Sequence, residues 1–240
     1  MISILFHAVV YDPLYNGLIF LIEIIPAHDV GFAVILLTIA VRTILFPLSR
    51  RAIETQAAMK KIAPEIEQLK EKHKDNREEQ GRAIFALYRE RGVHPFASVG
   101  LLLAQLPVIF ALYWIFAVGG LPEIYSDLLY SFTPMPLAVN MEFLGFIDMA
   151  GHSLVLGILA AAAQFAYTRL SMGKRLPAVL AGQNASFSAD LARSFDLQAR
   201  YMLPATFIVL SYFIPNAAML YLVTSNVFMV GQELFSGRRF

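Results

Sequence analysis

The chain has 240 residues, of which 58% are hydrophobic and 15% are charged, and its formal net charge is +1. This composition is too apolar for an ordinary soluble domain, and several segments approach the roughly 20 apolar residues needed to cross a bilayer. The sequence contains no cysteine. Disulfides, thiolate catalysis and cysteine-ligated zinc are therefore excluded.

The N-terminal segment, residues 1–28, contains no lysine or arginine. It has neither a basic n-region nor a small-residue cleavage site, so we expect no cleaved signal peptide and no transit peptide. This favours a bacterial plasma membrane over an organelle. The apolar stretch from Asp12 to Ile25 is broken by Pro26, and no basic residue anchors it. We therefore predict an external segment with an interfacial helix rather than a further span.

Apolar segments along the chain predict five transmembrane helices, and hence an all-α membrane protein. They lie at residues 29–49, 97–118, 151–171, 199–214 and 216–235. The fourth segment would be roughly 24 Å long as a helix, against a hydrocarbon core of about 30 Å. We expect the bilayer to be thinned at this helix, or neighbouring helices to shield it.

The distribution of basic residues predicts the orientation in the membrane. Eleven Lys or Arg fall in residues 50–96, five lie between Arg169 and Arg200, two follow the last apolar segment, and none occurs in residues 119–150. Under the positive-inside rule, residues 50–96, 172–198 and 236–240 are cytoplasmic, whereas the N-terminus and the loop 119–150 are outside. The small, polar loop 172–198 is expected to be mobile.

Residues 50–96 predict a cytoplasmic helical hairpin. Apolar residues recur at helical spacing over residues 62–73 and again over 83–88, with a polar turn between them. Gly92 supplies the permissive backbone expected at a helix C-terminus. Pro64 is expected to perturb the first helix or to mark its restart. Because eleven basic residues are mixed with eight acidic ones, we expect no direct DNA binding.

Arg42 lies inside the first apolar segment, where a guanidinium is costly and usually faces a bundle interior or a water-filled cavity. No acid within the apolar segments stands ready to neutralise it. We therefore expect a hydrated cavity, open to the cytoplasm, in which Arg42 attracts acidic groups of a passing polypeptide. Alternatively, Arg42 lies roughly 12 Å from the inner end of the segment, which Arg50 marks, and its long side chain snorkels towards the membrane interface there. Polar residues in the segments, among them Thr38, Gln105, Gln164, Ser225 and Asn226, either converge on this cavity or make ordinary contacts between helices.

Motifs of catalytic sites are missing from the sequence. It contains no Gly-x-Ser-x-Gly, no His-Glu-x-x-His and no phosphate-cradling glycine loop. Asp148 and His152 are four residues apart, but no third ligand lies near them, so we interpret them as hydrogen-bonded or solvated residues at the outer end of a helix. We expect no enzyme activity, no cofactor and no metal.

Four blocks of the sequence, taken together, resemble a known family. They are residues 31–51, which run through Arg42 into Leu45-Phe-Pro-Leu-Ser49; residues 59–73; residues 88–95 followed by 105–113; and residues 201–226. These blocks are similar to the YidC/Oxa1/Alb3 family of membrane protein insertases, in a bacterial YidC-like, minimal five-span form.

The resemblance implies five transmembrane helices around a hydrophilic groove that is open to the cytoplasm and to lipid but closed outside. Arg42 would receive the hydrophilic, often acidic tail of an incoming membrane protein, whose hydrophobic segment then moves laterally into the bilayer. Gln105, Gln164, Thr38, Ser225 and Asn226 would add polarity to the groove. No nucleotide would be hydrolysed, because partition of the apolar segment into lipid, helped by the membrane potential acting on acidic tails, would supply the driving force. The family often has Trp where this chain has Leu222, so the corresponding aromatic contact is not expected.

The resemblance also implies partners in membrane protein biogenesis. Nascent membrane proteins are the expected substrates, and a monomer is the expected functional state. A Sec-type translocon, the signal-recognition receptor and the ribosome are candidate partners of the cytoplasmic loops. For delivery and partner contact the candidate residues of the hairpin are Lys60, Lys61, Glu65, Lys70, Lys72 and Arg77.

Two other classes of function stay open. A small transporter or channel could use Arg42 as an ion or substrate site, although the sequence shows no internal repeat of the kind that many transporters have. A structural assembly factor for one complex is the third reading.

Overall fold

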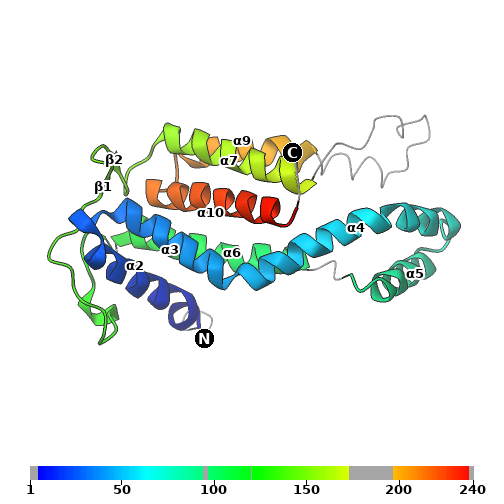
Figure 1. Ribbon diagram of the computed structural model, residues 1–240, viewed down its shortest axis with the longest axis horizontal. Helices are drawn as coiled ribbons and strands as arrows, with labels where there is room; N and C mark the ends of the chain where they lie inside the picture. Colours follow the sequence, from blue (N-terminus) through cyan, green and yellow to red (C-terminus); the bar gives the residue numbers. More distant parts are fainter. Residues whose placement is uncertain (1–4, 94–96, 120, 173–196, 238–240) are drawn as a thin grey trace. The chain divides into compact units, whose positions relative to one another are not determined.

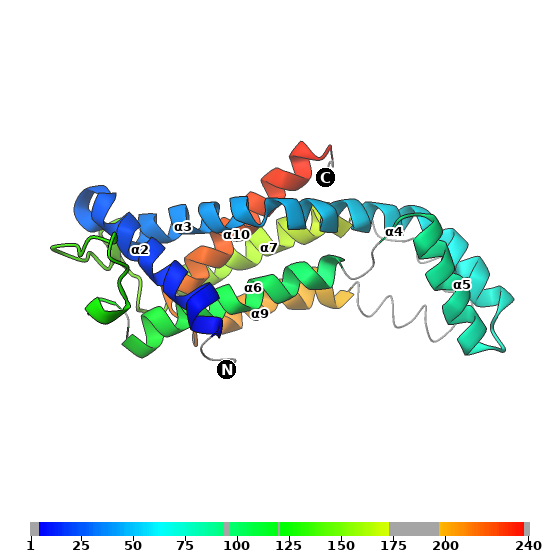
Figure 2. The ribbon, with the colours of Figure 1, turned by 90° about the horizontal axis from the view of Figure 1, so that it is seen from below.

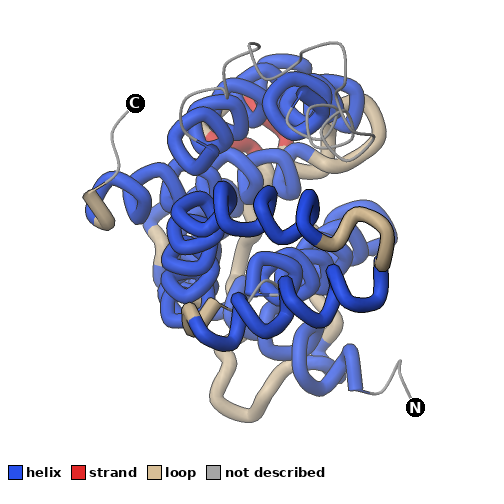
Figure 3. Tube along the Cα trace, turned by 90° about the vertical axis from the view of Figure 1, so that its right-hand side faces the viewer, coloured by secondary structure: helices blue, strands red, loops and turns tan. Residues whose placement is uncertain are grey.

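The computed structural model describes residues 5–93, 97–119, 121–172 and 197–237. Helices dominate this part of the chain, as Figure 3 shows, which confirms the expected helical class. The chain forms two compact units. We call Met1–Thr43 with Pro107–Phe240 the bundle unit, and Ile44–Leu106 the hairpin unit.

The N-terminal helix packs one face into the core of the bundle unit. A π-helical turn, η1 (His7–Tyr11), continues into α2 (Asp12–Ile24). The buried side chains of α2 include Tyr15, Leu18 and Ile19. The helix ends before Pro26, as the sequence predicts, because proline has a fixed φ and no backbone N–H.

The first predicted span is divided into two helices. α3 (Val30–Ile44) belongs to the bundle unit, and α4 (Phe46–Lys72) begins after Leu45 and belongs to the hairpin unit. Pro47 lies in the first turn of α4. Proline has no N–H to donate to the preceding turn, so it interrupts the backbone hydrogen bonds of a continuous helix. It is tolerated in the first turn of a helix, where that N–H would have no partner. The single helix expected over residues 29–49 therefore does not form.

Helices occupy the remaining four predicted spans. They are α6 (Ala97–Tyr113) with the π-helical turn η3 (Trp114–Gly119), α7 (Leu154–Met172), the π-helical turn η6 (Gln198–Met202) with α9 (Leu203–Leu210), and α10 (Asn216–Phe235). α7 packs against both α9 and α10 (Figure 1). A side chain at Gly157 of α7 would place its Cβ 2.6 Å from the Cβ of Ser211. The glycine therefore permits close packing beside α9.

These helices differ in length and in hydropathy, and both properties decide whether a helix can span a membrane. Of the described helices, only α7 is long and apolar enough by itself to cross a membrane. The pair of α3 and the first part of α4 would add a second span if the two are taken together, and Gln105–Gly119 is a shorter apolar helix. The count of five spans therefore stays a prediction.

One hydrophobic core joins α2, α3, the C-terminal half of α6, α7 and α10. Its members include Tyr15, Leu18, Val34, Leu112, Ile115, Leu156, Ala160, Met219 and Tyr221. The core lies within the bundle unit, so that unit has the packing needed to hold polar side chains in fixed positions.

The predicted external loop 119–150 is tied to α2 by an amide side chain. Nδ2 of the buried Asn16 donates to the carbonyl of Leu128 at 2.8 Å, and its Oδ1 accepts from the backbone N–H of Tyr130 at 2.6 Å. The hydroxyl of Tyr15 accepts a hydrogen bond from the backbone N–H of Tyr125 at 2.9 Å. These contacts fix the first half of the loop to one helix.

The second half of the loop forms a short hairpin. β1 (Glu142–Phe143) pairs antiparallel with β2 (Ile147–Asp148). Nδ2 of Asn216, at the start of α10, donates to the carbonyl of Asp148 at 2.7 Å. The loop is therefore bonded to the bundle at both halves. The predicted cytoplasmic loop 172–198 lies outside the described residues except at its two ends.

The hairpin unit contains the antiparallel pair that the sequence predicts. α4 packs against α5 (Arg77–Glu90), as Figure 2 shows, and Nε2 of Gln80 donates to the carbonyl of Lys70 at 2.9 Å. Nη2 of Arg91 lies 2.8 Å from Oε2 of Glu65, and this hydrogen bond raises the pKa of Arg91. α4 continues through Pro64, so the restart considered there does not occur.

Candidate functional site

Arg42 lies in the last turn of α3 and is held against α10. Its Nε atom donates to Oγ of Ser225 at 2.6 Å, and Nη2 donates to the same hydroxyl. Nη1 lies 3.6 Å from Sδ of Met229. Only 6% of the Arg42 surface is exposed. The guanidinium therefore does not extend into solvent, and α10 covers the side chain that we expected in an open, hydrated cavity.

The acceptors of Arg42 are uncharged. Among the described residues, no carboxylate forms an ion pair with Arg42. A hydroxyl and a thioether are acceptors, the thioether a weak one, and neither carries a compensating charge. A buried ion without a partner is unfavourable, and its attraction for an opposite charge is strong where the local dielectric is low. Arg42 is therefore a buried cation whose charge the described acceptors do not balance.

Glu233 is a buried residue that the sequence analysis overlooked. Ser225, Met229 and Glu233 follow one another at intervals of four and share one face of α10. Glu233 is fully buried, although the described ion pairs do not join it to Arg42. The sequence alone predicts no acid in the apolar segments that neutralises Arg42. The spacing of four from Met229 is the signal that would have identified Glu233.

The other predicted groove residues of the bundle unit are buried. Thr38 lies one turn before Arg42, and its hydroxyl donates to the carbonyl of Val34 at 2.6 Å. Nε2 of Gln164 donates to Oγ1 of Thr168 at 3.0 Å. Both hydrogen bonds stay within one helix. The structure thus joins Arg42 to Ser225, while Thr38 and Gln164 bond locally.

Two predicted residues carry amide atoms that lack a hydrogen-bond partner in the described structure. Asn226, next to Ser225 on α10, is buried and its Nδ2 is unpaired. Gln105 lies in α6 within the hairpin unit, and its Oε1 is unpaired. Buried polar atoms of this kind are unusual in folded proteins. Asn226 therefore adds unsatisfied hydrogen-bonding capacity one residue from the acceptor of Arg42.

The hairpin residues predicted to contact partners lie on α4 and α5. Glu65 pairs with Arg91, and Lys70 lies 3.9 Å from Glu67, measured from Nζ to Oε1. Lys61, Lys72 and Arg77 are exposed, whereas the side chain of Lys60 is outside the described part of α4. Lys61, Lys72 and Arg77 are therefore solvated, whereas Glu65 and Lys70 are partly exposed and lie near residues of opposite charge.

The fold and site define a helical protein with a buried guanidinium, which no described carboxylate pairs with, in one unit and a charged helical hairpin in the other. The sequence model of the family described as "60Kd inner membrane protein" matches residues 21–240. The chain belongs to this family.

Curated relatives match most of this chain. One from Anaeromyxobacter dehalogenans (strain 2CP-C) is 30% identical over 222 residues, which cover 91% of this chain and 35% of the relative. One from Magnetococcus marinus is 28% identical over 226 residues, which cover 93% of this chain and 34% of the relative. One from Clostridium tetani is 28% identical over 212 residues, which cover 88% of this chain and 83% of the relative. Each is named membrane protein insertase YidC. The chain spans about a third of the length of the first two relatives.

Proposed function

We propose that this chain is a membrane protein insertase and chaperone without enzymatic activity. It receives the hydrophilic tail of a nascent membrane protein and releases the hydrophobic segment laterally into the bilayer. The observation that carries the proposal is Arg42, a buried guanidinium whose acceptors in the described structure are the uncharged Ser225 and Met229. Membership of an inner membrane protein family and the names of the relatives support it.

An acidic tail would replace the uncharged acceptors of Arg42. A carboxylate can accept two parallel N–H bonds from a guanidinium, and such charge-assisted pairs are stronger than bonds to neutral acceptors. Folding has already desolvated Arg42, so the incoming carboxylate brings the missing charge to a prepared site. Ser225 then becomes available to bond other polar groups of the tail, together with the unpaired amide of Asn226.

We propose a plasma (inner) membrane protein with five spans, an external N-terminus and a cytoplasmic C-terminus. The helices that occupy the predicted spans and the basic residues at 50–91 support this topology. The fourth span would consist of the five residues of η6 and the eight of α9. Such a helix is roughly 20 Å long, well below a hydrocarbon core of about 30 Å. A local thinning of the bilayer there would shorten the path of a polar tail.

We propose that the hairpin unit serves delivery and partner contact. Its exposed residues carry charges of both signs on a helical pair that forms a compact unit by itself. The ribosome, a signal-recognition receptor and a Sec-type translocon are the candidate partners, and the chain acts as a monomer without a cofactor. A surface with mixed charges favours specific protein contacts over general anion binding.

Insertion into liposomes tests the proposal. A single-span substrate with an acidic tail is presented to liposomes that contain the wild type, Arg42→Lys or Arg42→Ala, and a neutral-tail substrate is the control. We expect insertion of the acidic substrate to be retained by Arg42→Lys and reduced by Arg42→Ala, with a smaller change for the neutral substrate. Equal insertion by all three proteins would remove Arg42 from the mechanism. Solute flux without insertion by the wild type would instead support a transporter.

A further inference from the structure

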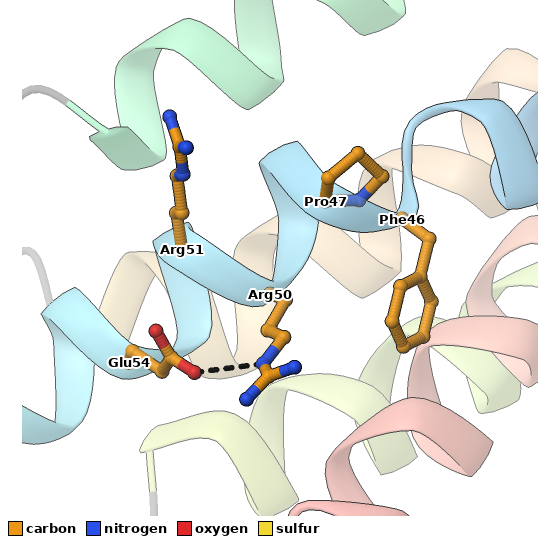
Figure 4. A pocket seen from close by; sticks show the side chains of 5 residues that line it. All are labelled: Phe46, Pro47, Arg50, Arg51 and Glu54. Atoms are coloured by element: carbon orange, nitrogen blue, oxygen red, sulfur yellow. Dashed lines mark hydrogen bonds and ion pairs between the residues drawn. The ribbon is translucent and has the colours of Figure 1, made fainter.

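A second site lies at the beginning of α4, within the hairpin unit. An open hollow of about 330 Å³ is lined by Phe46, Pro47, Arg50, Arg51 and Glu54, as Figure 4 shows. None of these residues is used in the proposed binding of a tail by Arg42. All five come from consecutive turns of one helix, so the hollow does not depend on the placement of another element.

The hollow carries a net positive charge. Nε of Arg50 donates to Oε1 of Glu54 at 2.8 Å, and both side chains are largely exposed. Arg51 extends away from this pair in Figure 4 and forms no ion pair with any residue that the structure describes. The guanidinium of Arg50 is therefore shared with the carboxylate of Glu54, whereas that of Arg51 is available to a ligand.

Apolar rings lie beside the basic groups. Phe46 is one helical turn before Arg50, and Pro47 is one turn before Arg51. Phe46 is 42% exposed although it is a large hydrophobic side chain. A ligand that fits this pattern has an anionic group for the guanidinium and an apolar part for the rings. A free inorganic anion would use only the first of these features.

A phosphate bonded to a lipid has this chemistry. The planar guanidinium matches the oxygens of a phosphate, and Arg binds it with two parallel hydrogen bonds more readily than Lys does. Phe46 and Pro47 directly follow the apolar α3, whereas Arg50 and Arg51 are the first charged residues after it. Basic pockets next to the cytoplasmic end of a span bind anionic lipid head groups in this way.

We propose that the hollow binds the phosphate of an anionic membrane lipid. Arg51 is the principal contact of the phosphate, Arg50 is a second contact that Glu54 restrains, and Phe46 and Pro47 face the apolar part of the lipid. The proposal rests on the proposed function in one respect, since the topology places Ser49 at the cytoplasmic surface of the membrane.

Lipid binding by the full chain tests this site without any substrate protein. The detergent-solubilised protein is titrated with phosphatidylglycerol or with phosphatidylcholine of the same acyl chains, and bound lipid is counted by native mass spectrometry. Arg51→Gln should weaken phosphatidylglycerol binding about fivefold, as expected for one basic residue at a membrane surface, and leave phosphatidylcholine unchanged. Glu54→Gln should strengthen phosphatidylglycerol binding because it releases Arg50.

The hairpin offers matched controls for both changes. Arg82 and Glu78 form an exposed pair four residues apart, with Nη2 and Oε1 separated by 2.6 Å, and so resemble Arg50 and Glu54. Glu78→Gln changes the net charge as Glu54→Gln does, and Arg89→Gln, at an exposed residue of α5, changes it as Arg51→Gln does. Neither control should alter lipid binding. Equal effects of the controls would show attraction by net charge alone and overturn the proposal.

Two competitors separate the sources of the anionic group. Inorganic phosphate and a soluble acidic peptide are added to the complex with phosphatidylglycerol, and neither should displace the lipid at an equal concentration. Displacement by either one through Arg51 would assign the hollow to a free anion or to a polypeptide. Liposome insertion measured on the same variants keeps the two proposals apart. Insertion without lipid binding at Arg51 rejects this site alone, whereas lipid binding without insertion rejects only the proposed function.

Discussion

Ser225 of α10 accepts a hydrogen bond from Nε of Arg42 on α3, with 2.6 Å between the two atoms. The contact joins residues 183 positions apart and makes a hydroxyl the main acceptor of a buried positive charge. It therefore both positions α3 beside α10 and leaves the guanidinium without charge compensation from the described residues. The stability of the bundle unit and the proposed binding of a tail therefore involve the same pair.

The pair predicts a measurable coupling. Ser225→Ala should lower the free energy of unfolding by about 1.5–3 kcal/mol, the range for hydrogen bonds to charged groups. The same change in an Arg42→Met background should cost clearly less, because no buried charge is left unpaired. Thermal unfolding of the wild type, the two single variants and the double variant in one detergent measures the coupling. Thr43→Ala, which removes an exposed hydroxyl bonded within α3, is the control and should have little effect. Equal costs in the two backgrounds would show that the pair is not coupled.

The space around two helical glycines predicts opposite effects of substitution by alanine. A Cβ at Gly157 would lie 2.6 Å from the Cβ of Ser211, so Gly157→Ala should destabilise the protein by about 1–3 kcal/mol through overpacking. At Gly231, in α10, a Cβ would meet nothing within 4 Å. Gly231→Ala should be neutral or stabilise the helix by up to about 1 kcal/mol. The melting temperatures of both variants check this, and a loss at Gly231 as large as that at Gly157 would contradict it.

The attachment of loop 119–150 depends on one amide side chain. Asn16→Ala removes the acceptor of the Tyr130 N–H and the donor to Leu128, and the loss should be about 1–3 kcal/mol for the unsatisfied buried groups. Limited proteolysis should then cut the loop faster. Asn140, whose Oδ1 accepts from the backbone N–H of Glu142, offers a control within the loop itself. If cleavage is as fast in Asn140→Ala as in Asn16→Ala, the contact with α2 is not what protects the loop.

The separation into two units predicts that the hairpin can be removed without unfolding the bundle unit. Replacing residues 60–91 by a flexible linker should impair insertion of a substrate in cells and leave the unfolding of the bundle unit nearly unchanged. Arg50, Arg51 and Glu54 lie before the replaced segment, so the variant retains the residues that line the hollow of α4. Normal insertion in cells by this variant would show that the hairpin has no part in delivery.

The sequence predicts helix ends where a single residue decides them. Pro26 follows the end of α2, and Gly92 adopts a positive φ of 62° just after α5, as expected from their backbone chemistry. The break at Leu45 was not predicted, because Pro47 suits the first turn of a new helix as well as the end of an old one. Pro64 shows the converse, since α4 continues through it.

Prediction of the site was limited by partners distant in the sequence. Arg42 was identified because a charge in an apolar segment is unusual, and Ser225 because it is polar in another such segment. Their mutual bond depends on the packing of α3 and α10, which periodicity does not specify. The hydroxyl of Thr38 had an acceptor one turn away in its own helix, and it uses that acceptor. Glu233 lies close to the end of an apolar segment, where a carboxylate is expected in solvent, yet tertiary packing buries it.

The boundaries of the hairpin unit have an evolutionary consequence. Because Ile44–Leu106 forms a compact unit by itself, α4 and α5 can gain or lose whole helical turns together while the residues of the bundle core stay the same. Selection on the surface of the hairpin and selection on the buried core therefore act on separate stretches of the gene.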